Sequence, residues 1–132
     1  MTNHKFRCIT NNPKIVAAGF HNTEFHDTDV LGIFRITADE VLKGYKLLSH
    51  PLLSSVRPDI TPYRTVILED VRKGIDAESV KLIQNAIDYA EKLYALREIP
   101  IYKRWNDKAK FDFQSIDCSI IEQSFEVRQW SK

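Results

Sequence analysis

The sequence predicts a single α/β domain in which a mainly parallel sheet of about four strands is flanked by helices. Three observations lead to this prediction. Apolar stretches of strand character alternate with stretches of helical periodicity, in the order strand, helix, strand, helix, strand, strand, helix, helix. The chain has 132 residues, the size of one ordinary domain, so residues 1–132 are assigned to one domain. Hydrophobic residues make up 43% of the chain and charged residues 28%, which is typical of a globular protein.

The first part of the chain reads as two strands separated by a short helix. Residues 5–10 alternate like a strand and stop at Asn11-Asn12-Pro13, where Asn favours a turn and Pro prevents further pairing. This proline also suits the first position of a short helix that Gly19 would end. The polar segment 21–29 is expected to be a surface connection. The nearly continuous apolar run 30–36 is expected to be a strand covered on both faces.

A helix and two strands are expected next. Thr37 fits the N-cap and Glu40 the third position of a capping box, which predicts a short helix from residue 37. Leu47-Leu48 reads as a short strand, and residues 63–69 have high β-propensity. Prolines at positions 51, 58 and 62 disfavour a regular helix in the loop between these two strands.

The last two elements are predicted to be helices. Asp76 is expected to cap a helix from Ala77 to about Glu98, because apolar residues recur there at helical spacing and Pro100 bounds the run. Residues 115–129 fit both strand alternation and helical spacing. We favour a helix for this tail, since a helical layer would cover the sheet.

Charge and hydropathy exclude two classes of function. The formal net charge is +1, so bulk charge gives no reason to expect binding to nucleic acid or to a membrane surface. No apolar run approaches the roughly 20 residues that span a bilayer. The N-terminus lacks the apolar segment of a signal peptide. We therefore expect a soluble, cytoplasmic protein.

The residue types that bind metals and cofactors do not form known motifs. The histidines and cysteines lack metal-binding spacing, and no glycine-rich nucleotide loop is present, so no metal site and no cofactor are expected. Cys8 and Cys118 are interpreted as buried thiols of a reducing compartment rather than as a disulfide.

The candidate site lies in the polar, proline-punctuated loop that joins the third and fourth strands. If the first and third strands are parallel, the turn after the first strand meets this loop at the carboxyl ends of the strands. Arginine suits the binding of carboxylate or phosphate, so a small anion of either kind is an expected ligand. The predicted ligand-binding residues are Asn11, Asn12, His50, Ser54, Ser55, Arg57, Tyr63 and Arg64.

These residues also have structural interpretations, which the sequence leaves open. The two asparagines could simply close a turn. Arg57 and Arg64 could pair with the acidic residues at positions 59, 69 and 70. His50 is the best candidate for proton transfer because its unperturbed pKa lies near neutrality, yet no carboxylate is adjacent in sequence to orient it. The structural interpretation, in which His50 fixes the loop through hydrogen bonds, is preferred.

Several motifs of the chain resemble the GrdX family. They are ITNNP at residues 9–13, KGYKLLSHPL at 43–52, SVRP at 55–58, TPYRT at 61–65 and DFQSID at 112–117. The resemblance covers most of the chain in order. It implies an accessory protein encoded with the glycine, sarcosine or betaine reductase systems of anaerobic, amino-acid-fermenting bacteria. It gives no residue a catalytic role.

Three functional hypotheses follow from the sequence. The leading one is an accessory protein of uncharacterised biochemical activity that binds a partner protein, such as a component of the reductase complex, or a small anionic metabolite. The alternative is a small enzyme in which His50 is the general acid or base and Arg57 or Arg64 holds a substrate anion. The third is a structural homodimer formed through the tail helix.

Overall fold

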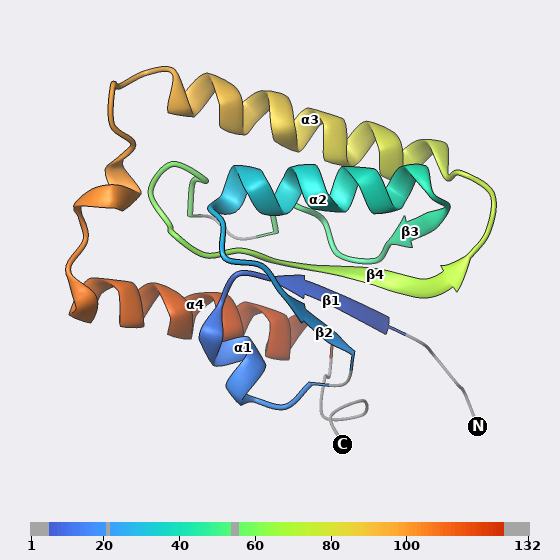
Figure 1. Ribbon diagram of the computed structural model, residues 1–132, viewed down its shortest axis with the longest axis horizontal. Coiled ribbons are helices and arrows are strands. Elements are labelled where there is room, and N and C mark those ends of the chain that lie inside the picture. The colour runs from blue at the N-terminus through green and yellow to red at the C-terminus, as the bar shows by residue number, and fades with distance from the viewer. Residues whose placement is uncertain (1–5, 21, 54–55, 126–132) are drawn as a thin grey trace.

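The computed structural model describes residues 6–20, 22–53 and 56–125, which form a four-stranded sheet between two pairs of helices (Figure 1). The strands are β1 (Phe6–Thr10), β2 (Thr23–Phe25), β3 (Tyr45–Leu47) and β4 (Thr65–Arg72), in the order β2-β1-β4-β3. The helices α2 (Val30–Leu42) and α3 (Ala77–Tyr94) cover one face of the sheet. The helices α1 (Pro13–Ala17) and α4 (Asp107–Phe125) cover the other, and the 3-10 helix η1 (Ile101–Arg104) precedes α4.

Each face of the sheet carries its own hydrophobic core, because successive residues of a strand point to opposite sides. Ile9, Val66 and Leu68 pack with the apolar side chains of α2 and α3. Cys8 and Ile67 pack with α1 and α4. All five side chains are fully buried. This alternation confirms the two predicted strands, although residue 5 of the strand predicted at 5–10 lies outside the described residues and β4 begins at Thr65 rather than at residue 63.

The prediction of a mainly parallel sheet was wrong, although the α/β class is confirmed. β1 pairs parallel with β2, whereas β4 lies between β1 and β3 and is antiparallel to both. The described residues between β3 and β4 include no crossover helix, and parallel neighbours need such a connection. Because β1 and β3 are both antiparallel to β4, they run in the same direction and end at the same edge of the sheet.

Residues 30–36, predicted to be a strand, form the first half of α2. Asp29 begins this helix, since its Oδ1 accepts a hydrogen bond from the Gly32 backbone N–H at 2.8 Å. The apolar run misled the prediction because α2 is buried against both the sheet and α3, and such a run fits a buried strand equally well. Thr37, predicted to be the N-cap, lies inside the helix, where its Oγ1 donates to the Ile33 carbonyl at 2.8 Å.

Residues 22–29 contain β2, although segment 21–29 was predicted to be a surface connection and residue 21 lies outside the described residues. β2 pairs with β1 along one side, with Cys8 opposite Thr23 and Thr10 opposite Phe25. A short strand at the edge of a sheet buries little surface, so it needs few apolar residues. The sequence of β2 is polar, so it lacked the apolar residues by which the other strands were predicted.

The other predicted helices are present, although α3 ends at Tyr94 rather than at about Glu98. α1 begins at Pro13, and Gly19 follows its end with a φ of +74°. Asp76 caps α3, because its Oδ2 accepts from the Ser79 backbone N–H at 3.0 Å. The tail is helical, although α4 already begins at Asp107 and residues 126–129 of the predicted helix lie outside the described residues. None of the helices in the described ranges has the length and apolarity that a membrane span requires.

Gly44, which joins α2 to β3, is expected to tolerate no side chain. Its φ is +107°, and a Cβ atom would lie 2.0 Å from the Lys73 carbonyl oxygen. Gly44→Ala should lower the free energy of unfolding by more than about 1 kcal/mol, because strain at positive φ adds to a clash with backbone. Urea denaturation of parent and variant measures this difference.

The matched control for this substitution is Gly74→Ala. No neighbouring heavy atom lies within 4 Å of a Cβ atom built at Gly74. Its unfolding free energy should therefore stay within about 1 kcal/mol of the parent. Equal losses for the Gly44 and Gly74 variants would contradict the geometry of the α2–β3 connection.

Candidate ligand-binding site

A cavity of about 520 Å³ opens at the edge of the sheet where β1 and β2 end and β4 begins. This volume is typical of small-molecule sites, which span roughly 300–1,000 Å³. Two of the predicted site residues, Asn11 and Tyr63, line the cavity. The charged residues that line it are Asp27, Asp29, Lys103 and Lys110.

Asn11 forms the wall of the cavity where three segments of the chain meet. Its Nδ2 donates to the Thr28 carbonyl at 2.7 Å and to the Pro62 carbonyl at 2.9 Å. Its Oδ1 accepts from the Arg64 backbone N–H at 2.9 Å. The residue is 4% exposed, so its amide is engaged in joining the end of β1 to the segments before α2 and β4.

Asp29 and Tyr102 attach η1 to the start of α2. Asp29 caps α2 through Oδ1, and its Oδ2 accepts a hydrogen bond from the Tyr102 hydroxyl at 2.8 Å. Burial and this hydrogen bond raise the pKa of Tyr102, so the hydroxyl remains a donor at neutral pH. The Tyr102 ring also packs against Tyr94, with 5.8 Å between the ring centroids. These contacts fix the position of Lys103, the next residue of η1.

Three charged side chains at the cavity are available to a ligand. Asp27, Lys103 and Lys110 make no ion pair within 4.0 Å and no side-chain hydrogen bond with any other residue that the structure describes. The Tyr63 hydroxyl accepts from Gln114 Nε2 at 2.9 Å and keeps its own hydrogen for donation. The cavity therefore offers two ammonium groups, one carboxylate and a hydroxyl donor.

Asn12, also predicted to bind a ligand, belongs instead to a buried polar ring formed by Thr10, Asn12, Thr65 and Asp117. Asp117 Oδ2 accepts from Asn12 Nδ2 at 3.0 Å and from Thr65 Oγ1 at 2.6 Å. The Thr65 and Thr10 hydroxyl oxygens lie 2.7 Å apart, and Thr10 Oγ1 accepts from the Asn12 backbone N–H at 3.0 Å. All four residues are at most 7% exposed. The ring connects β1, β4 and α4.

Arg57 and Arg64 lie in different environments. Arg57 donates Nε and Nη2 to the two carboxylate oxygens of Asp59, at 3.0 and 2.7 Å, which is the pairing that the sequence left open. Arg64 is 3% exposed and donates Nη2 to the Val56 carbonyl at 2.8 Å. Its buried Nε and Nη1 have no acceptor among the described residues. Burial lowers the pKa of Arg64.

His50 is exposed and does not line the cavity. Its Nδ1 accepts a hydrogen bond from the Leu52 backbone N–H at 3.0 Å, which fixes the loop locally. Ser54 and Ser55 lie outside the described residues. The structure therefore brings Asn11 and Tyr63 to the cavity, while the roles of His50 and Arg57 in an enzyme remain predictions.

Cys8 and Cys118 are buried free thiols, as the sequence predicted. Burial raises the pKa of Cys8 to about 12 and the pKa of Cys118 to about 11. Both sulfur atoms are therefore protonated at neutral pH, which makes them poor nucleophiles.

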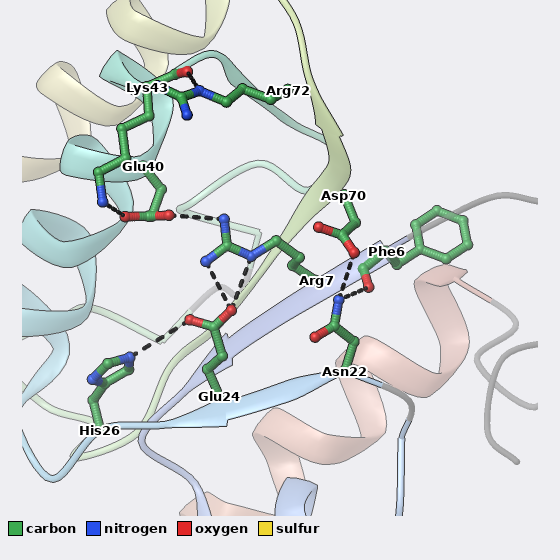
Figure 2. A network of polar contacts seen from close by, with 9 residues as sticks. All are labelled: Phe6, Arg7, Asn22, Glu24, His26, Glu40, Lys43, Asp70 and Arg72. Atoms are coloured by element: carbon green, nitrogen blue, oxygen red, sulfur yellow. Dashed lines mark hydrogen bonds and ion pairs between the residues drawn. The ribbon is translucent and has the colours of Figure 1, made fainter.

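A separate charged network joins β1, β2 and α2 (Figure 2). Arg7 donates Nε to Glu24 Oε2 at 2.9 Å and Nη1 to Glu40 Oε1 at 2.8 Å. Lys43 Nζ donates to Glu40 Oε2 at 2.8 Å, and the Tyr45 ring lies 4.5 Å from the Arg7 guanidinium carbon. These charges are paired with one another and none lines the cavity, so the network holds the layers together.

The fold and the cavity define a small three-layer α/β protein with a ligand-sized cavity at one edge of its sheet. A family model described as GrdX-like protein matches residues 7–126. The chain therefore belongs to the GrdX-like protein family, as its motifs predicted. Comparisons with curated proteins and with solved structures found no match.

The sequence did not single out Asp27, Lys103 or Lys110. They come from three segments that carry no motif and that only the folded chain brings together. One signal existed: recognition of β2 would have placed the acidic residues that follow it at the carboxyl edge of the sheet, beside Asn11.

Asp117→Asn is expected to change the pH dependence of stability. Burial raises the pKa of Asp117 above its unfolded value of about 3.9, so the folded state binds more protons. The stabilising contribution of Asp117 is complete below the unfolded pKa and is lost as pH rises through the folded pKa, by at most about 1.36 kcal/mol per pH unit. Urea unfolding at a series of pH values should show the free-energy difference, parent minus variant, falling as pH rises.

Glu40→Gln is the control of opposite sign. Although burial acts to raise it, hydrogen bonds from Lys43 and Arg7 lower the pKa of Glu40 below its unfolded value of about 4.3. This contribution is present above the unfolded pKa and is lost as pH falls through the folded pKa. The free energy of unfolding of the parent minus that of the variant should therefore rise with pH. Slopes of the same sign for the two variants would contradict these assignments.

Proposed function

We propose that this protein is an accessory protein of a glycine, sarcosine or betaine reductase system in the cytoplasm of an amino-acid-fermenting anaerobe. We further propose that it binds a small metabolite through the carboxylate or phosphate group of that metabolite. Membership of the GrdX-like family supports the cellular setting. The observation that carries the binding proposal is that Lys103 and Lys110 lie in the wall of one cavity and make no ion pair with any residue that the structure describes.

The two lysines are carried by elements that other contacts hold in place. Lys103 lies in η1, which Asp29 fastens to α2 through Tyr102. Lys110 lies in α4, which the buried polar ring fastens to the sheet. A carboxylate or phosphate between the lysines would accept charge-assisted hydrogen bonds from both, which are about twice as strong as neutral ones. The Tyr63 hydroxyl is a further donor in the same wall.

A component of the reductase complex is the second ligand class that the sequence predicts. Family membership is the support for such a partner, since the resemblance implies that the protein is encoded with the reductase. The contacts of His50 and Arg57 do not support the enzyme alternative, because both side chains form hydrogen bonds with residues of their own loop.

Lys103→Gln and Lys110→Gln are each expected to weaken binding of small carboxylates or phosphates. The loss should be about three- to tenfold, because each removes one charge-assisted hydrogen bond at a partly exposed position. A thermal-shift screen of the parent protein identifies the ligands, and calorimetric titration of the parent and the two variants gives the affinities. Binding should also weaken as the salt concentration rises.

The control variant is Lys81→Gln, on the exposed side of α3 and outside the cavity wall. It removes the same charge and should leave the affinity unchanged. A flat screen against carboxylates and phosphates would overturn the binding proposal. A pull-down with the tagged protein from an anaerobic host tests separately whether the protein belongs to a reductase system. Recovery of no reductase component would count against that part of the proposal.

A further inference from the structure

The cavity carries charges of both signs in equal number. Two of its four charged residues are acidic, Asp27 and Asp29, and two are basic, Lys103 and Lys110, so their formal charges cancel. A ligand with a single negative charge would therefore be attracted by the lysines and repelled by the aspartates. The cavity wall as a whole is therefore not selective for anions.

The two aspartates have different roles. Both carboxylate oxygens of Asp29 are occupied, one by the Gly32 backbone N–H and the other by the Tyr102 hydroxyl. Asp27 is exposed and has no hydrogen bond or ion pair with another described residue. The acidic group that remains for a ligand is therefore Asp27, and it comes from the β2–α2 connection rather than from the elements that carry the lysines.

We propose that the cavity binds a small zwitterion, with its anionic group at Lys103 and Lys110 and its cationic group at Asp27. The proposal rests on the proposed function and adds a second charge to the ligand. A zwitterion pairs with the free groups of both signs, and its own net charge of zero matches that of the wall. Tyr63 and Tyr102 also line the cavity, and aromatic side chains are favourable neighbours of a cationic group.

Four probes of similar size separate the contributions of the two charges. They are 2-aminobutyrate and 4-aminobutyrate as zwitterions, butyrate as the matched anion and butylamine as the matched cation. Calorimetric titration of the full chain should give an affinity for at least one aminobutyrate about tenfold or more above the affinities for butyrate and butylamine. The two zwitterions differ in the separation of their charges, so their ranking reports the spacing in the cavity.

Asp27→Asn identifies the cation site. This variant should bind the aminobutyrates no better than butyrate, while its affinity for butyrate stays equal to that of the parent or rises. Asp39→Asn is the matched control, because Asp39 is exposed on α2 and lies outside the cavity wall. It should keep the preference for zwitterions. Loss of the preference in both variants would overturn the assignment to Asp27.

The results also separate this inference from the proposed function. Equal affinities of the parent for butyrate and the aminobutyrates, weakened by Lys110→Gln, would overturn the zwitterion and leave the anion proposal standing. Binding of inorganic phosphate without binding of any of the four probes would do the same. Binding of none of these compounds would overturn both.

Discussion

The buried ring of Thr10, Asn12, Thr65 and Asp117 determines where the cavity wall lies. An ionisable carboxyl group taken out of water needs hydrogen-bond partners, and its loss of them costs several kcal/mol. The donors to Asp117 come from the turn after β1 and from the start of β4, so α4 can satisfy its carboxyl group at only one position on the sheet. Lys110 lies two helical turns before Asp117, on nearly the same side of α4. The ring therefore also fixes the direction of Lys110.

The two adjacent asparagines that follow β1 bind different layers of the fold. Asn11 binds the segments before α2 and β4, whereas Asn12 binds α4 and also caps α1 through its Oδ1. Neighbouring residues of extended chain point in opposite directions, which is why two amides in succession can reach both sides. The motif ITNNP thus has a structural explanation in this chain. Through its two asparagines, the motif attaches elements on both faces of the sheet to the end of β1.

Sequence reasoning succeeded where local chemistry decides the structure and failed where tertiary contacts do. Alternation identified β1, high β-propensity identified β4, and the cap at Asp76 identified the start of α3. The run 30–36 became a helix because α2 is buried on two sides, which no window of seven residues can reveal. The polar edge strand β2 and the antiparallel insertion of β4 depend on pairing partners that are distant in sequence. The site was found only in part for the same reason: Asn11 and Tyr63 lie within the motifs ITNNP and TPYRT, while the charged residues of the cavity wall lie in no motif.

The position of β4 between β1 and β3 has a consequence for the order of events during folding. Thr10 pairs with Thr65, so the central pair of strands closes across a sequence separation of 55 residues, and contacts of such long range slow folding. The buried ring also needs Asp117, which lies 52 positions beyond Thr65 in the sequence. The cavity is consequently one of the last features of this domain to form, because its wall needs both the paired central strands and α4 in place.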